Sequence, residues 1–175
     1  YEVEATNKVA FFPGSTIGNF LPEQAVDVLQ EIKAMVGKKG GLLIGVDLRK
    51  ESAILNAAYN DKETYTEQFN KNLLVRINRE LNANFDIQQF KHHAFFNEEK
   101  KRIEMHLVSL QQQQVHIDEH VFQFKKDQSI LTEFSHKYTL EHFYKLAKKA
   151  GFQRVKTWTD ENLLFSVHYL RVAKV

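Results

Sequence analysis

The chain has 175 residues, of which 43% are hydrophobic and 26% charged, a composition that fits a folded globular protein and excludes a disordered or membrane-spanning one. The formal net charge is only +2, and acidic and basic residues alternate locally, so we expect neither nucleic acid nor a membrane as a partner. The absence of cysteine excludes disulfides, thiolate catalysis and zinc–cysteine sites, and together with the lack of a long apolar run it favours a cytoplasmic protein.

The first predicted elements form a strand, a helix and a second strand. A short apolar run at Lys8 to Phe12 is followed by a loop and by an amphipathic helix from Leu21 to Val36, which has Pro22 near its start. A continuously apolar run then ends at Asp47, as in a parallel strand that is covered on both faces. Because parallel strands need a right-handed crossover, this segment predicts a βαβ unit.

The loop between the first strand and the first helix contains Gly14, Ser15 and Asn19. It follows a strand of an open α/β sheet, which is the position of the ligand crevice in such folds. Gly14 lets a ligand approach the backbone, and Asn19 offers both a donor and an acceptor. The alternative is a simple glycine-containing turn, and this segment alone slightly favours that alternative.

The middle of the chain changes its pattern twice. Residues 51–81 have helical periodicity and are expected to form a pair of helices, whereas residues 90–96 and 102–107 alternate as two strands around a polar turn. Two further short runs, at 114–117 and 121–124, can extend this hairpin into an antiparallel sheet. This stretch is therefore expected to be an α+β insertion.

The last segment resumes the α/β pattern. A helix at 140–150, closed by Gly151, precedes two strands at 153–159 and 163–172 that finish the sheet in antiparallel fashion. The predicted organisation is a sheet domain at residues 1–48 and 136–175 and an inserted α+β subdomain at residues 49–135.

Several side chains could carry chemistry, but each also has a structural explanation. His92 and His93 are adjacent, so in a strand they point to opposite faces, and no histidine spacing here predicts a metal site. Glu133 and Ser135 share a face if their segment is extended, and they could hold a nitrogen heterocycle; a solvated strand edge is the alternative. Tyr59 could face the crevice or pack at a helix end.

Six segments, in order along the chain, resemble the histidine-specific N-methyltransferases that use S-adenosylmethionine and make trimethylhistidine for ergothioneine. The segments are FFPGSTIGNF, DLRKESAILNAAYND, FNKNLLVRINRELNANFD, RIEMHLVS, LTEFSHKY and WTDENLLFSV. The resemblance runs from about Val9 to the C-terminus and is specific because it is an ordered series. It implies a class I methyltransferase (Rossmann-like) sheet with an inserted α+β subdomain that binds the amino acid.

The resemblance also implies roles for individual residues. Histidine is the implied small-molecule substrate and S-adenosylmethionine the cofactor, with no metal. Its α-amine attacks the sulfonium methyl in line, and no side chain is assigned to catalysis. The implied contacts are Asn19 and Tyr59 to the substrate carboxylate, Glu133 and Ser135 to the imidazole nitrogens, Met105 as a pocket wall, and Gly14 and Ser15 on the cofactor side.

The chain departs from the family because the glycine-rich cofactor loop and the ribose-binding acid precede Val9 there and are absent here. The resemblance is thus to a C-terminal portion with an incomplete sheet and most of the cofactor site elsewhere, so we expect these residues alone to be inactive. The strand at residues 8–12 is expected to leave an open edge through which the chain self-associates. The alternatives are a related amino-acid or indole N-methyltransferase and a non-catalytic interaction module.

Overall fold

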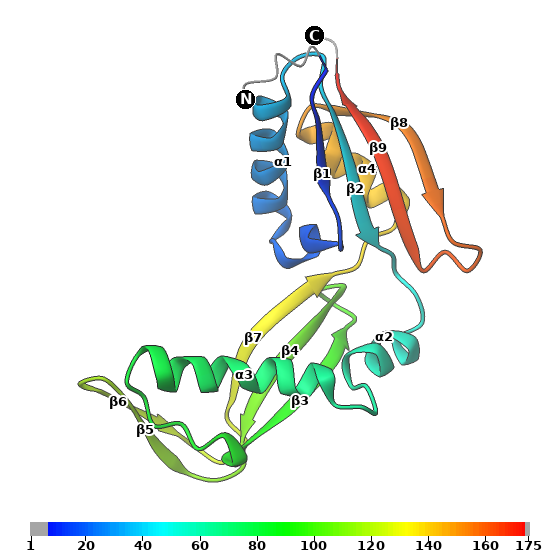
Figure 1. Cartoon of the computed structure of the whole chain (residues 1–175). Helices are drawn as coiled ribbons and strands as arrows, with labels where there is room; N and C mark the ends of the chain where they lie inside the picture. The colour runs from blue at the N-terminus through cyan, green and yellow to red at the C-terminus, as the bar shows by residue number, and fades with distance from the viewer. Residues whose placement is uncertain (1–6, 174–175) are drawn as a thin grey trace. The chain divides into compact units, whose positions relative to one another are not determined.

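A computed structural model describes residues 7–173, so the outermost residues of the predicted domains, 1–6 and 174–175, lie outside the described part (Figure 1). The α-helices are α1 (Pro22–Val36), α2 (Ser52–Tyr59), α3 (Tyr65–Glu80) and α4 (Leu140–Lys149). The strands are β1 (Val9–Phe12), β2 (Gly41–Asp47), β3 (Phe90–Asn97), β4 (Arg102–Ser109), β5 (Gln113–Ile117), β6 (His120–Phe124), β7 (Ser129–His136), β8 (Phe152–Thr159) and β9 (Phe165–Val172). No helix within residues 7–173 is long and apolar enough to cross a membrane.

The contacts of the chain group it into two compact units, which we call the sheet unit and the α+β unit. The sheet unit comprises residues 1–50, 98–102 and 135–175, and the α+β unit comprises residues 51–97 and 103–134. Residues 98–102, the turn between β3 and β4, thus have their contacts in the sheet unit, although the sequence pattern had placed them in the insertion.

The sheet unit contains a four-stranded sheet in the order β1-β2-β9-β8. β1 runs parallel to β2, with Val9 opposite Gly41, which confirms the predicted parallel crossover. β9 pairs antiparallel with both β2 and β8, so the sheet ends in the expected antiparallel hairpin. Among the described strands β1 lies at one edge of this sheet.

Two helices cover the sheet with their apolar faces. α1 starts at Pro22, where the Gln24 side chain accepts a hydrogen bond from the Leu21 N–H, and it buries residues three to four positions apart. α4 starts where the Thr139 hydroxyl accepts from the His142 N–H, which satisfies one of the free amides of the first turn. Figure 1 shows both helices beside the sheet, and their apolar faces meet the buried residues of β2. Those core residues include Ala25, Leu29, Leu42, Ile44, Val46, Phe143 and Leu146.

The α+β unit agrees with the sequence prediction in its helices and differs from it in its sheet. The stretch 51–81 is a pair of helices, as expected, and both carboxylate oxygens of Asp61 accept backbone N–H groups, from Tyr65 and Thr66, at the start of α3. Hydrogen bonds with Thr66, and to a smaller extent with Tyr65, lower the pKa of Asp61. The expected extension of the β3–β4 hairpin by β5 and β6 was wrong: β5 and β6 form a separate two-stranded sheet, and β7 completes the order β3-β4-β7.

Candidate functional site

The loop after β1 is fixed at the carboxyl end of β2. Gly14 and Ser15 both have positive φ angles, 72° and 58°, which turn the chain sharply after the strand. The Ser15 hydroxyl is buried and accepts a hydrogen bond from the Asp47 N–H at 2.8 Å. The loop therefore lies where the two parallel strands end, as the sequence predicted.

The same loop packs closely against the end of β7. A Cβ atom built on Gly18 would lie 2.8 Å from the His136 carbonyl oxygen and 3.0 Å from the Ser135 Oγ, closer than a side chain allows. Only glycine permits this approach, and it brings Ser135 next to the loop that carries the exposed Asn19. Four of the predicted residues, Gly14, Ser15, Asn19 and Ser135, thus lie in one region of the sheet unit.

A buried lysine, which the sequence analysis did not identify, joins Ser135 to β2. The Lys137 side chain is 1% exposed, and its ammonium group lies 2.8 Å from the Ser135 Oγ and 2.8 Å from an Asp47 carboxylate oxygen. Asp47 also pairs with Lys50 at 2.6 Å. The sequence does carry one signal for Lys137: it follows Ser135 by two positions, and the acidic residue Asp47, at the end of a buried strand, offers a partner for it.

Tyr59, Met105 and Glu133 belong to the α+β unit. Tyr59 is the last residue of α2, and its carbonyl oxygen lies 2.9 Å from the Nε2 of His92. Because a carbonyl only accepts, His92 carries its proton on Nε2, and its Nδ1 accepts from the Asn70 amide at 3.0 Å. This pairing fixes the end of the helix from which Tyr59 projects.

Met105 is buried in a small apolar cluster, and Tyr59 packs against the same cluster. The structure therefore brings these two predicted residues together within the α+β unit. Glu133 is partly buried on β7, two residues before Ser135. Because this segment is a strand, residues two positions apart, such as Glu133 and Ser135, lie on the same face of it.

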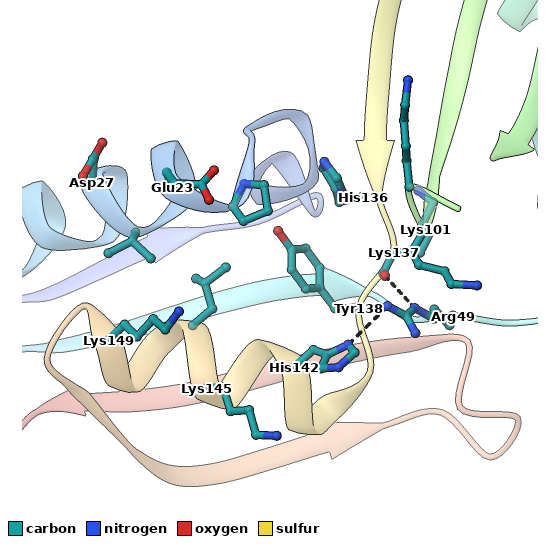
Figure 2. Close-up of a pocket in the computed structure, with 14 residues that line it drawn as sticks. Glu23, Asp27, Arg49, Lys101, His136, Lys137, Tyr138, His142, Lys145 and Lys149 are labelled. Atoms are coloured by element: carbon teal, nitrogen blue, oxygen red, sulfur yellow. Dashed lines mark hydrogen bonds between the residues drawn. The ribbon is translucent and has the colours of Figure 1, made fainter. Parts of the chain in front are cut away.

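A basic cavity of about 520 Å³ also lies in the sheet unit (Figure 2). Arg49 donates hydrogen bonds there to the Lys137 carbonyl oxygen and to His142 Nδ1, both at 3.2 Å. Burial raises the pKa of Tyr138 to about 12, so its hydroxyl stays neutral. None of the seven predicted site residues lines this cavity. Its lining includes Glu23 and Asp27 from α1, Lys145 and Lys149 from α4, and Lys101.

The described residues do not cluster as metal ligands do. No group of three or more histidine, aspartate or glutamate side chains within residues 7–173 could hold a metal ion. A small organic cofactor fits better beside the loop: a Cβ atom on Gly14 would have only Thr16 Oγ1 within 4 Å, at 3.9 Å, so the backbone there is open to a ligand.

Comparison with solved structures defines the fold class. A chain described as an S-adenosylmethionine-dependent methyltransferase from Clostridium acetobutylicum superposes with a TM-score of 0.50 and 9% identity, covering 99% of this chain and 62% of that one. The fold is therefore that of an S-adenosylmethionine-dependent methyltransferase. The family model for the SAM-dependent histidine-specific methyltransferases matches residues 1–172, and the chain belongs to that family.

Two curated relatives are named histidine N-alpha-methyltransferase. The protein from Mycobacterium tuberculosis is 38% identical over 152 residues, covering 86% of this chain and 47% of the relative. The protein from Mycolicibacterium smegmatis is 36% identical over 156 residues, covering 87% of this chain and 48% of the relative. The chain thus spans about half the length of the curated relatives it matches.

Proposed function

We propose that this chain is the C-terminal part of an enzyme that transfers methyl groups from S-adenosylmethionine to the α-amine of histidine. The observation that carries the proposal is the packing of Ser135 against the Gly14–Asn19 loop in a member of this family. Ser135 is suited to bind an imidazole nitrogen, and the loop beside it is open to a cofactor. Both lie at the carboxyl ends of parallel strands, where α/β folds bind ligands.

The proposed substrate contacts follow from the chemistry of histidine. Glu133 accepts a hydrogen bond from one imidazole N–H, and Ser135 serves the other ring nitrogen. Such a polar site penalises an analogue that leaves either group unpaired. Asn19 and Tyr59 hold the carboxylate, and Met105 supplies an apolar wall. The α+β unit is, in this proposal, an inserted subdomain that binds the amino acid.

The proposed chemistry needs orientation more than activation. When bound, S-adenosylmethionine supplies a methyl group already activated by its sulfonium charge. Gly14 and Ser15 shape the cofactor side of the loop, and the substrate contacts point the neutral α-amine at that methyl. The amine would take up the methyl group of the bound cofactor, with the S–C electron pair staying on sulfur as the N–C bond forms, and the amine proton would leave to water.

Two further parts of the proposal concern the setting of the enzyme. The absence of cysteine favours the reducing cytoplasm. The edge position of β1 favours self-association of the 175-residue chain through that strand.

Replacement of Glu133 by Ala in the full-length protein tests the proposed substrate. We expect histidine to bind about 10- to 100-fold more weakly, because a hydrogen bond to a carboxylate is lost. Binding of S-adenosylhomocysteine should stay unchanged. Isothermal titration of histidine into protein saturated with S-adenosylhomocysteine measures both. A wild-type protein that binds S-adenosylhomocysteine but gives no heat with histidine would refute the proposal.

A further inference from the structure

We infer that Lys137 is a positioning residue that holds the Ser135 hydroxyl as a hydrogen-bond donor toward the substrate, so that the site selects the neutral form of the imidazole. The inference rests on the proposed function and deepens it. It assigns a specificity-determining role to a buried ion pair that makes no proposed contact with the substrate.

The contact between Lys137 and Ser135 leaves only one direction for the hydrogen bond. An ammonium group has three donors and no acceptor, so at 2.8 Å the Ser135 Oγ must accept from Lys137. Both side chains are buried, which makes the contact strong and keeps water from replacing it. With an oxygen lone pair occupied in this way, the hydroxyl proton of Ser135 is left to be donated to another group.

Asp47 keeps the ammonium group in place. Its carboxylate lies 2.8 Å from Lys137 Nζ, and its backbone N–H donates to Ser15 in the loop. Asp47, at the end of β2, therefore holds both Lys137 and the loop that contains Ser15. Because a buried charge without its partner is costly, Lys137 and Asp47 act as one unit.

A donor at Ser135 discriminates between the two forms of histidine. The neutral imidazole has one N–H and one acceptor nitrogen, which match an acceptor at Glu133 and a donor at Ser135. The imidazolium has two N–H groups, so it satisfies Glu133, but Ser135 can accept its second N–H only with the remaining lone pair, beside the positive charge of Lys137. Charged or titratable groups near Ser135 include Glu133 and His136 on the same strand, and Tyr138 and Lys101 next to Lys137. Asp47 at the end of β2, and Arg49 and Lys50 after it, are the others that the contacts name.

The selection for neutral imidazole can be measured as the pH dependence of histidine affinity. An imidazole has an ordinary pKa of about 6.5, so only about a tenth of it is neutral at pH 5.5. We expect the affinity of the full-length protein for histidine to fall about 10-fold between pH 7.5 and 5.5, with S-adenosylhomocysteine saturating. Without Lys137, both lone pairs of Ser135 are open to the imidazolium and no lysine charge opposes it, so the fall should shrink to less than about 3-fold.

The decisive variant is the double substitution Lys137→Met with Asp47→Asn, which removes both charges and leaves no unpaired buried ion. Lys50→Met is the matched control, because Lys50 also pairs with Asp47 but, unlike Lys137, makes no hydrogen bond to Ser135, and it should keep the wild-type pH profile. Ser135→Ala should lower the affinity at pH 7.5 and flatten the profile in the same way. Retained binding of S-adenosylhomocysteine shows that each variant is folded.

Three outcomes would overturn the inference. A double variant that binds S-adenosylhomocysteine and keeps the 10-fold fall removes Lys137 from the selection. A wild-type affinity that stays level from pH 7.5 to 5.5 removes the selection itself, even if no variant folds. A wild-type protein that does not bind histidine at pH 7.5 contradicts the proposed function, and this inference falls with it.

Discussion

His168 is a fully buried ionisable ring in β9 of the sheet unit. Its Nε2 lies 2.8 Å from Ser166 Oγ and its Nδ1 lies 3.2 Å from Thr157 Oγ1, so two hydroxyl groups satisfy the ring. Burial, and to a smaller extent the charge of Arg154, lowers the pKa of His168 to about 4. The ring is therefore neutral at physiological pH and takes part in the fold as an uncharged hydrogen-bonding group.

This burial predicts acid destabilisation. The pKa of His168 is about 4 in the folded state, against an ordinary value of 6.5, so the unfolded state binds more protons between these values. The free energy of unfolding should fall as the pH drops from about 6.5 to 4, by up to about 3 kcal/mol, and this contribution should not change further below that range. Urea unfolding of the full-length protein at pH 7 and pH 4.5 measures the loss.

His168→Gln provides the comparison, because the amide can still hydrogen-bond to the two hydroxyls but does not titrate. Carboxylates elsewhere titrate equally in both proteins, so the difference between the two pH profiles isolates His168. If the variant loses as much stability as the wild type over this interval, the histidine is not the source.

At the level of residues, the sequence could suggest a pair of candidate side chains but not the residues that contact them. Ser135 and Glu133 could be paired because strand alternation places them on one face. Lys137 was missed, although it follows Ser135 by two positions, because lysine is almost never fully buried unless paired and its partner Asp47 comes from a distant part of the chain. The close contact of Gly18 with β7 could likewise not be predicted, because β7 lies far from Gly18 in the sequence.

Among the elements, β1 has two properties that favour association with another chain. It is the edge strand of its sheet among the described strands, and Phe11 on it is 69% exposed. An exposed apolar edge strand offers unpaired backbone groups and an apolar surface to a second chain.

We therefore expect the 175-residue chain to self-associate in a concentration-dependent way, as measured by light scattering after size exclusion or by sedimentation. Phe11→Lys should weaken this association by at least several-fold, because a charge on an edge strand opposes pairing. Met35→Lys is the control, since Met35 is a similarly exposed apolar residue, at 66%, on a helix and not on an edge strand. If Met35→Lys disrupts the association and Phe11→Lys does not, the interface is not formed by β1 and the prediction is wrong.

The elements themselves were predicted with uneven success, and the reason is physical. Helical periodicity located α1 and α4, and a continuous apolar run located β2, because these elements supply the core of the sheet unit. The pair of helices α2 and α3 was also expected, whereas the contact that begins α3, Asp61 accepting two backbone N–H groups, is seen only in the structure. The separation of β5 and β6 from β4 depends on β7 pairing there instead, which periodicity cannot show.

On the scale of the whole molecule, the order of the six segments was more informative than any one of them. The loop at residues 14–19, Tyr59 and the Glu133–Ser135 pair each have a structural explanation when taken alone, whereas the ordered series of segments indicated the family whose model matches residues 1–172. The assembly of the site is different in kind, because it depends on contacts such as that between Gly18 and β7, which join segments more than a hundred residues apart along the printed sequence.

The central position of β2 has a consequence for hydrogen exchange. β2 pairs with β1 on one side and β9 on the other, and its residues Leu42, Ile44 and Val46 are fully buried. Its amides should exchange with deuterium only when the sheet unit opens as a whole, so they report the global stability of that unit without denaturant. The two-stranded β5–β6 hairpin should exchange first; slower exchange there than in β2, by mass spectrometry, would contradict this order.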